Sequence, residues 1–513
     1  MVTTMAGSLD LGPAGRPFGA PTIFGETDGE TTPTAVDRGA IVLVFMVLAG
    51  LALAVGLFVA TGRPEVAVAA AGALPAVAIL VRYPFAAVLL WVLCIPYFIE
   101  VDTVTPHPAF WLLHRLMVVA MLGLVLVYHV LGQIRSRLRP TAVDVAILAF
   151  LGLGVANVLL FADNPSRMLV GFYDRLVVPF LMFWLIRALS PGQRDLQRLA
   201  IAGAITVAVQ AAIGVLSWVA PSVLPSQWLG RAGERTVGTF GGPGPFTVTL
   251  VFFGLLVAHY ALAGSGRRPR PLLIAVVAAG LFAIFLSFQR GGWLGALVGF
   301  TGLWLVHRGP TTKLAVGAMV VALLLAIGPL ATEFEFASER LSDADTVDSR
   351  LITFDAAIQM VEDQPITGFG YGQFEKFDEQ FKRSVGDVAF EEGGSLHNSW
   401  LGLAAENGIP GVILYVLPAI LLFVRSIRLR LGLTRRSFVG AGLVVVMWAG
   451  VLDVFVVSNT MDMLHSGTFG TMLAWIGLAI IAVQLEQVRD RPRRARSGIL
   501  ADMPVPARVP SGR

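Results

Sequence analysis

Apolar runs recur along almost the whole chain and are separated by short polar breaks. Each run has about 20 residues, which is enough for a helix to cross the hydrocarbon core of a bilayer. A helix satisfies its own backbone hydrogen bonds in lipid, so the runs predict helices rather than strands. We expect 12 to 14 spans, because some neighbouring runs are divided by very short breaks. The fourteen candidate spans are 39–60, 66–81, 84–99, 111–131, 142–162, 168–187, 199–220, 245–263, 271–288, 291–307, 314–331, 409–427, 438–457 and 466–485.

The composition agrees with an all-α integral membrane protein. Of 513 residues, 56% are hydrophobic and only 14% are charged, and the mean hydropathy is +0.75. Soluble domains carry about 25% charged residues, so a soluble enzyme of this composition would have too little polar surface. The single cysteine, Cys94, excludes an intramolecular disulfide framework and a cysteine-based zinc site.

Positive charge is concentrated in alternate breaks between the apolar runs. This distribution is typical of membrane topology rather than of nucleic-acid binding, and by the positive-inside rule those breaks and both termini are cytoplasmic. The N-terminal tail has no apolar stretch after a basic start, so it does not resemble a signal peptide. The predicted regions are a disordered cytoplasmic tail at 1–38, transmembrane helices at 39–331, an extracytoplasmic loop at 332–408, further transmembrane helices at 409–485 and a basic cytoplasmic tail at 486–513.

The long outer loop has helical patterning of its own. Asp348 is a candidate N-cap for a helix that ends near 362, before Gln364-Pro365. Ser395 is a candidate N-cap for a second helix, with Asn407-Gly408 as its stop or kink. Long loops with their own structure are usually functional. The expected apolar face of the first helix consists of Leu351, Phe354, Ile358 and Val361.

His397 is the candidate catalytic residue of this loop. A cap at Ser395 would place it in the first turn of a helix, where the positive end of the helix dipole disfavours the imidazolium form. A neutral imidazole there can accept a proton from a hydroxyl nucleophile. The alternative is a histidine that caps the helix or hydrogen-bonds at the membrane interface.

Four arginines do not fit the topology rule, and they are candidate ligands of an anion. Arginine at a membrane surface or within a span is costly unless it is paired or functional, and guanidinium matches phosphate oxygens. An anionic lipid head group such as a diphosphate would suit such a set. The alternative is pairing with Glu234, Glu333 or Asp348, or contact with lipid phosphate. The four residues are Arg231, Arg235, Arg290 and Arg350. Arg175 also lies in an apolar run, but its neighbour Asp174 favours a structural role.

Two acidic pairs have a spacing that can hold a divalent cation beside a diphosphate. They are Glu100 with Asp102 and Asp343 with Asp345. Short acidic clusters in loops are more often solvated, and we expect no metal site. The glycine-rich GFGYGQF at 368–374 lacks the pattern of a phosphate-binding loop, and tight backbone turning is its expected use.

The order of these pieces resembles the O-antigen ligase and polymerase superfamily of bacterial membrane glycosyltransferases. The chain departs from the family pattern in two places, since GGPGPF lacks the Asn that often follows the Pro, and Gln289-Arg290 replaces Ser-Arg. The resemblance covers about 235 to 485. The matching stretches are RTVGTFGGPGPF at 235–246, LSFQRGGWLG at 286–295, DSRLITFDAAIQMVEDQPITGFGYGQF at 348–374 and HNSWLGLAAENGIPG at 397–411.

The resemblance implies an all-α, GT-C-like enzyme whose donor is a glycan on undecaprenyl diphosphate at the outer leaflet. His397 would orient or deprotonate an acceptor hydroxyl on a glycan, lipid or protein, and attack from the opposite face would invert the anomeric centre. Arg231, Arg235, Arg290 and Arg350 would hold the diphosphate. Asn398, Glu406 and Gly370 would support the site, and neither a metal nor another cofactor is implied.

Three alternatives remain open at the level of sequence. A polysaccharide polymerase shares the donor and differs only in the acceptor. A transporter or flippase of lipid-linked glycans would need a polar path at mid-membrane and repeated halves with broken helices, and neither feature is evident. In a membrane scaffold, the long loop would be a docking surface.

Overall fold

A computed structural model describes residues 76–98, 110–131, 140–230, 235–263, 270–307, 309, 345–382, 396–434, 438–464 and 468–501, with the backbone alone at 345–351 and 490–501. The chain divides into two compact units, Met1–Ala76 with Tyr128–Arg135, and Val77–Val127 with Ser136–Arg513. Of the first unit, only Ala76 and residues 128–131 are described. The contacts reported below lie within the second unit.

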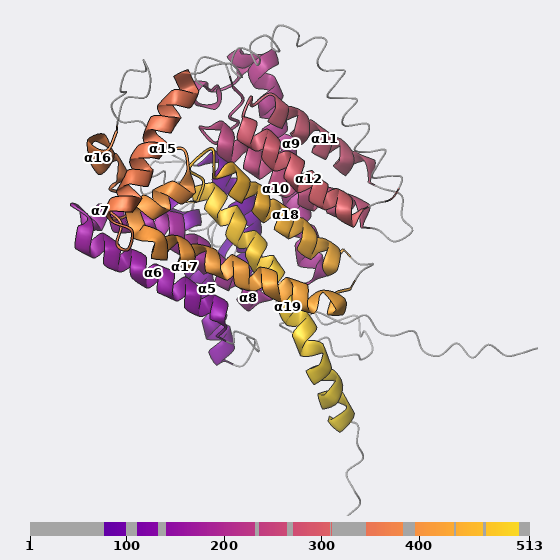
Figure 1. The fold of residues 1–513 in the computed structure, drawn as a ribbon. Helices are drawn as coiled ribbons and strands as arrows, with labels where there is room; N and C mark the ends of the chain where they lie inside the picture. Colours follow the sequence, from indigo (N-terminus) through magenta and orange to yellow (C-terminus); the bar gives the residue numbers. More distant parts are fainter. Residues whose placement is uncertain are drawn as a thin grey trace, which may run out of the picture. The chain divides into compact units, whose positions relative to one another are not determined.

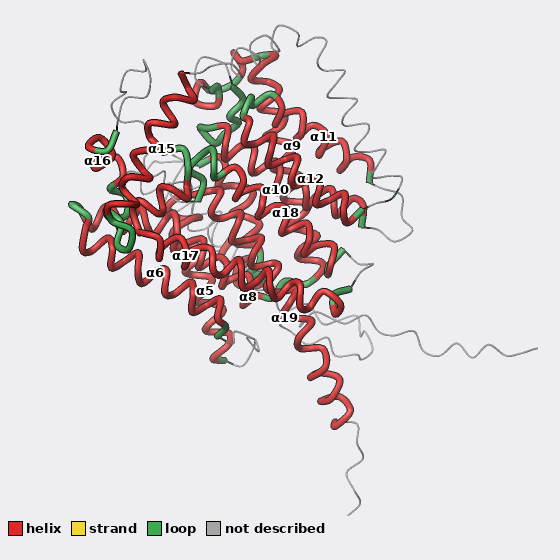
Figure 2. Tube along the Cα trace, in the orientation of Figure 1, coloured by secondary structure: helices red, strands yellow, loops and turns green. Residues whose placement is uncertain are grey.

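The described part of the chain is helical and contains no strand beyond an isolated bridge between Leu229 and Thr236 (Figure 2). The predicted all-α fold is confirmed. The α-helices are α3 (Ala86–Cys94), α5 (Met117–Val130), α6 (Ala142–Phe161), α7 (Pro165–Phe172), α8 (Val178–Leu189), α9 (Gln193–Val219), α10 (Pro243–Leu262), α11 (Pro271–Phe285), α12 (Arg290–Val306), α15 (Asp345–Asp363), α16 (Phe374–Phe377), α17 (Ser399–Leu429), α18 (Ala441–Val457) and α19 (Thr468–Ala501).

Seven helices of the described part are long and apolar enough to cross a membrane. Two of them contain π-helical turns, η2 (Trp111–Leu116) before α5, and η3 (Tyr173–Val177) between α7 and α8. Three shorter apolar helices, Ala86–Tyr97, Pro271–Phe285 and Ala441–Val457, complete this set. Ten of the expected spans coincide with these helices, and 291–307 coincides with α12, which is not among them. The spans 39–60, 314–331 and most of 66–81 lie outside the described residues. The total of 12 to 14 spans therefore stays a prediction.

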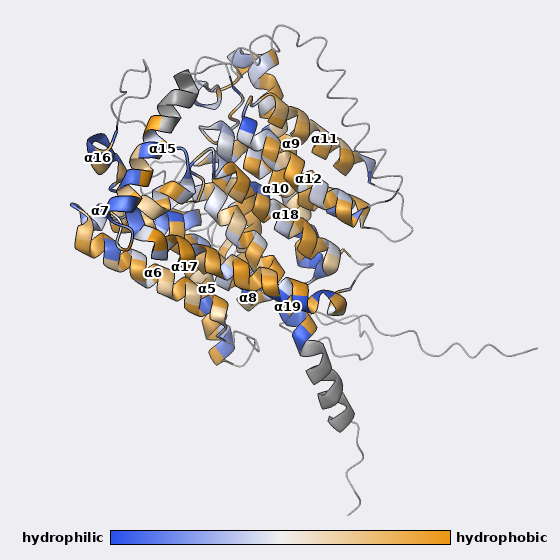
Figure 3. Cartoon of the chain, viewed as in Figure 1, coloured by the Kyte–Doolittle hydropathy of each residue, from blue (hydrophilic) through white to orange (hydrophobic). Residues whose placement is uncertain are grey.

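Large apolar side chains are exposed on the outer faces of the helices, which Figure 3 shows as mainly hydrophobic. Leu126, Leu160, Leu297 and Ile413 are each more than half exposed. Such faces would be unfavourable in water, whereas lipid tails solvate them at no hydrophobic cost. The exposure pattern is that of a multi-pass membrane protein.

The helices α9, α10, α11, α12 and α18 pack side by side (Figure 1). Three glycines of α12 let it approach its neighbours closely, because a Cβ atom at each would overlap an adjacent side chain. Gly295 faces Asp453 of α18, Gly299 faces Leu255 of α10, and Gly302 faces Ala449 of α18. Small residues at helix contacts are the usual means of close packing in membranes. Elsewhere, α6 packs on α17, and α19 packs on α8 and α18.

The two ends of this bundle differ in chemistry. At one end, the buried Arg187 of α8 forms ion pairs with Asp144 of α6 and, at 2.8 Å, with Glu486 of α19. At the other end of α6, Asn157 hydrogen-bonds to the glycine-rich loop and to α17. The family-like motifs therefore gather at the end opposite the Arg187 network. Which end faces the cytoplasm remains a prediction from the arginine distribution.

Candidate active site

The first motif is held against the turn that precedes α12. The backbone N–H of Thr236 donates to the carbonyl of Leu286 at 3.3 Å. The indole N–H of Trp218 donates to the Thr236 hydroxyl at 2.8 Å, and Thr236 is fully buried. These bonds fix the backbone beside the half-buried Arg235. The first and second motifs are therefore adjacent in space.

The second motif forms the beginning of α12. Buried Gln289 accepts a 2.9 Å hydrogen bond from the Thr247 hydroxyl and donates to Met461 Sδ at 2.7 Å. A Cβ atom at Gly291 would overlap Thr460, and one at Gly292 would overlap Thr247, so the helix start lies tightly on both neighbours. Arg290, the first residue of α12, is exposed.

The side chain of Gln289, the N-cap residue of α12, makes no capping hydrogen bond. The first N–H groups of a helix lack intrahelical partners, and the helix dipole places positive charge there. The guanidinium of Arg290 adds to this charge. By contrast, α10 begins with Pro243 and has a second proline at Pro245, which removes two N–H donors. The start of α12 is therefore the better anion-binding helix end of the two.

The glycine-rich loop wraps around the kink of α17. Its conformation depends on glycine, since Gly368, Gly370 and Gly372 all have positive φ, with Gly370 at 106°. The backbone N–H of Gly370 donates to the carbonyl of Glu406 at 3.0 Å. Gly408 has φ 68°, which confirms the kink predicted at Asn407-Gly408. The loop thus turns tightly against α17, as its sequence predicts.

Glu406 and Asn157 fasten this loop from two sides. The buried carboxylate of Glu406 accepts hydrogen bonds from the N–H groups of Gly372 and Phe374. The amide of Asn157 donates to the carbonyl of Thr367 at 2.8 Å and accepts from the N–H of Tyr371 at 2.6 Å. This geometry favours a structural role for Glu406.

The predicted cap of the fourth motif is wrong. Asn398, not Ser395, caps α17, since its side-chain oxygen accepts from the N–H groups of Trp400 and Leu401 at 2.9 and 3.1 Å. The helix begins at Ser399, so His397 lies just before the cap rather than in the first helical turn. His397 is half-buried. His397 still lies at the positive end of the α17 dipole, as predicted, because the N-cap Asn398 is the next residue.

The segment 458–464 between α18 and α19 contacts three of the structured motifs, and sequence reasoning missed it. Its Ser458 carbonyl accepts from the Ser399 N–H at 2.9 Å, and its Asn459 carbonyl accepts from the Asn398 side chain at 3.4 Å. Thr460 packs on Gly291, and Met461 packs on Gly244 of the first motif. The only sequence signal was a polar SNTMD run in a short break between apolar spans.

Arg175 and Asp174 point to different partners, although they are adjacent in η3. Asp174 is fully buried and forms a bidentate pair with Arg115, with bonds of 2.7 and 2.6 Å. Arg175 hydrogen-bonds Tyr371 of the glycine-rich loop, and its opposite charges are Asp462 and Glu406. The sequence led us to expect a structural role for Arg175 because Asp174 is its neighbour, but the carboxylate of Asp174 binds Arg115. Arg175 is instead a cation located where the loop, α17 and segment 458–464 meet.

The outer-loop helix is longer than expected. The helix α15 begins at Asp345, so Asp348 lies inside it rather than at its cap, and it ends at Asp363 before Gln364-Pro365 as predicted. The inward face contains Ile352, Ala356, Ala357 and Met360, whereas Ile358 is 45% exposed. Ile358 was therefore assigned to the wrong face.

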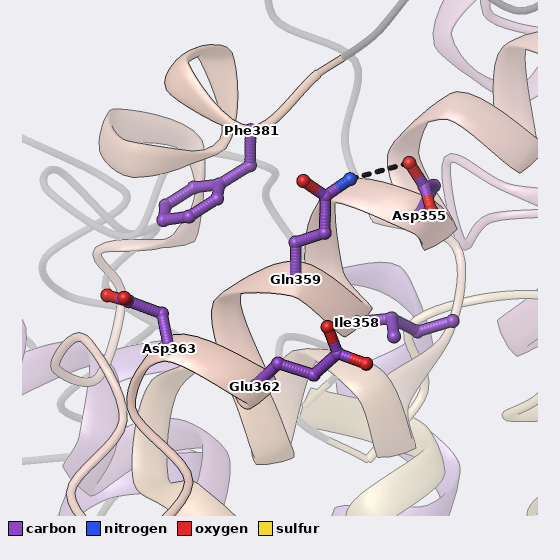
Figure 4. A pocket seen from close by; sticks show the side chains of 6 residues that line it. All are labelled: Asp355, Ile358, Gln359, Glu362, Asp363 and Phe381. Atoms are coloured by element: carbon purple, nitrogen blue, oxygen red, sulfur yellow. Dashed lines mark hydrogen bonds between the residues drawn. The ribbon is translucent and has the colours of Figure 1, made fainter.

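A shallow hollow of about 530 Å³ lies on this exposed face of α15, and Figure 4 shows its lining side chains. Asp355 accepts a 2.6 Å hydrogen bond from Gln359 there. The hollow is lined by Asp355, Ile358, Gln359, Glu362, Asp363 and Phe381. It contains none of the predicted site residues, so we assign it no part in the site.

Several predicted residues have no described side chain, so their roles stay predictions. Arg231, Glu100, Asp102 and Asp343 lie outside the described residues, and only the backbone is described at Arg350 and Asp345. Among the side chains that are described, no group of three or more His, Cys, Asp or Glu residues is arranged to hold a metal ion.

The comparison with known families identifies one region. Residues 274–416 match a family model described as O-antigen ligase. The match includes Arg290, α15, the glycine-rich loop and the start of α17, and it excludes residues 235–246 and segment 458–464. No curated protein matches the chain.

Proposed function

We propose a specific reaction for this ligase- or polymerase-like membrane enzyme, on the premise that residues 274–416 match a family model described as O-antigen ligase. It transfers a glycan from undecaprenyl diphosphate to an acceptor hydroxyl at the outer face of the cytoplasmic membrane, with inversion of the anomeric centre. The acceptor is a hydroxyl of a glycan, a lipid or a protein.

One observation carries this proposal. The motifs of Arg290 and His397 meet the same short turn, residues 458–460. Gly291 packs on Thr460, while Asn398 and Ser399 hydrogen-bond to the carbonyls of Asn459 and Ser458. A candidate anion-binding arginine and a candidate base are thus held by one rigid support, which suits a reaction between an anionic donor and a neutral nucleophile.

The arginines would bind the donor diphosphate and stabilise its charge as it leaves. Arg290 is the first residue of α12, where its guanidinium and the helix dipole would act together on an anion. Arg235 would join it, since the bond from the Thr236 N–H to the Leu286 carbonyl brings the first motif to the turn that precedes α12. We assign Arg231 and Arg350 to the same diphosphate. Charge that develops on the leaving group is what such preorganised donors stabilise best.

His397 would act as the general base. Its neutral imidazole accepts the proton of the acceptor hydroxyl while that oxygen forms a bond to the anomeric carbon. The bond between that carbon and the diphosphate oxygen breaks, and undecaprenyl diphosphate leaves with the electron pair. Asn398 caps α17 next to His397, and Glu406 and Gly370 hold the loop around α17, so these three residues support the site without contacting the substrates.

The proposal includes an orientation. The Arg187 end, close to the arginine-rich breaks, faces the cytoplasm with both termini, and the motif end faces outward. Lipid-linked donors presented at the outer leaflet would reach the start of α12 from the membrane. A transporter would instead need its polar groups along a path through the bundle, whereas the motifs here gather at one end.

Transfer can be tested with purified protein in liposomes, an undecaprenyl-diphosphate glycan and candidate acceptors, with and without chelator. We expect covalent transfer and release of undecaprenyl diphosphate in both conditions. Extension of the lipid-linked glycan itself would identify a polymerase, whereas glycan on a separate acceptor would identify a ligase. Movement of unmodified donor across the bilayer without transfer would contradict the proposal and favour a transporter.

A further inference from the structure

Four hydrogen bonds join Ser399 to segment 458–464. Its backbone N–H donates to the carbonyl of Ser458 at 2.9 Å. Its hydroxyl accepts from the N–H groups of Met463 and Leu464 at 2.8 and 3.0 Å, and donates to the carbonyl of Met461 at 3.4 Å. Ser399 is 1% exposed. The backbone and the hydroxyl of Ser399 together join the start of α17 to both ends of the segment.

Met463 and Leu464 are also held by α19. The hydroxyl of Thr471 donates to the carbonyls of Met463 and Leu464 at 3.2 and 3.1 Å. Met463, Leu464 and Thr471 are all buried. Buried N–H and carbonyl groups need partners, and here Ser399 supplies them for the N–H groups and Thr471 for the carbonyls. Loss of either hydroxyl would leave buried backbone groups unpaired.

Segment 458–464 also supports the start of α12, through a different set of contacts. Gln289 donates to Met461 Sδ at 2.7 Å, and Gly291 lies against Thr460. Arg290 lies between Gln289 and Gly291 in the chain, and His397 is two residues before Ser399. The distance between the proposed base and the proposed phosphate ligand is therefore set through this segment.

We propose that Ser399 is a positioning residue, which holds His397 in register with Arg290 by fastening α17 to segment 458–464. This inference rests on the proposed function. Ser399 contacts no substrate in this account. Ser399 acts on the geometry of the site, because transfer needs the base and the leaving group to be aligned to within about 1 Å.

The test compares Ser399→Ala with Ser426→Ala, a matched control in the same helix. Ser426 is also buried, and its hydroxyl donates to Leu422 and accepts from Trp448. We expect Ser399→Ala to lower kcat by about 100-fold while the affinity for undecaprenyl diphosphate changes by less than about threefold. Hydrogen exchange at the Met463 and Leu464 amides should accelerate. Ser426→Ala should leave the kcat and these amides unchanged.

Equal kcat values for the two variants would overturn the positioning role, as would a parallel loss of donor affinity and kcat in Ser399→Ala. His397→Ala is measured in the same series to separate the two proposals. An inactive His397→Ala with a fully active Ser399→Ala contradicts only the positioning role, whereas an active His397→Ala contradicts both. If Ser399→Ala does not fold, Thr471→Val loosens the same dipeptide from α19, and a normal kcat in that variant would overturn the inference.

Discussion

The carboxylate of Glu406 accepts a 2.7 Å hydrogen bond from the backbone N–H of Gly372, 34 residues earlier in the chain. Its second oxygen accepts from the N–H of Phe374 at 3.0 Å. A single buried side chain of α17 thereby fixes the glycine-rich loop, and this loop in turn encloses the kink that leads to the membrane-spanning part of α17. The role of Glu406 is therefore structural: it holds the outer loop against α17.

Glu406→Gln should destabilise the protein, because the amide offers one oxygen to two N–H donors and directs an NH₂ group at one of them. We expect a loss of about 1–3 kcal/mol in unfolding free energy, measured by thermal unfolding in detergent. Glu362→Gln, on the exposed face of α15, is the control and should have no effect. Identical unfolding of the two variants would exclude the fastening role.

Gly408→Ala should be more damaging than an ordinary glycine replacement in a helix. Gly408 has φ 68°, and a Cβ atom there would overlap the carbonyl oxygens of Ile366 and Pro365. Strain of this kind costs about 1–3 kcal/mol before the overlap is counted. Gly152→Ala in α6, where nothing lies within 4 Å, should be neutral or slightly stabilising. Unfolding temperatures of the two variants measure the difference, and a tolerated Gly408→Ala would refute this account of the kink.

Arg290→Ala should weaken binding of undecaprenyl diphosphate in lipid nanodiscs by about 10- to 100-fold, the range expected for a hydrogen bond to a charged group. Arg290→Lys should recover only part of this, because lysine cannot make the bidentate contact. Salt should weaken binding less in Arg290→Ala than in the wild type. Arg167→Ala, an exposed arginine of α7, serves as control. Donor affinity that is unchanged in Arg290→Ala would remove this residue from the donor site.

The protein should lose stability in mild acid through His307, which follows α12. The Nε2 of half-buried His307 lies 2.8 Å from Nδ1 of buried His259. Protonation of both rings would bring two positive charges together, so the contribution of this pair to stability is lost as the pH falls below the ordinary histidine pKa of about 6.5. Unfolding temperatures between pH 7.5 and pH 5 should therefore fall less in His307→Gln than in the wild type or in the exposed-site control His129→Gln. A parallel fall in all three proteins would contradict this role.

Hydropathy predicted the helices well because a membrane span is a local property of about 20 residues. The errors arose where distant contacts decide the outcome. Asn398 rather than Ser395 caps α17, since the bonds of Ser399 to segment 458–464 fix where the helix starts. The face of α15 was misjudged because the small residues Ala356 and Ala357 carry the packing, and small residues add little to an apolar pattern.

In the candidate site too, local motifs were predictable from the sequence and distant contacts were not. The motifs around Arg290 and His397 can be recognised in the sequence, and the family match covers both. Their common support, segment 458–464, follows the matched region and has no motif of its own. Similarly, Asp174 pairs with Arg115, 59 residues away, rather than with its neighbour Arg175. No short-range pattern contains such pairings.

The central claim is that His397 acts in the transfer step and not in donor binding. The most direct measurement is the single-turnover rate of glycan transfer in liposomes preloaded with saturating undecaprenyl-diphosphate glycan, for the wild type and His397→Ala. We expect His397→Ala to bind the donor as the wild type does and to transfer glycan at least about 100-fold more slowly. A transfer rate equal to that of the wild type, with donor bound equally, would contradict it.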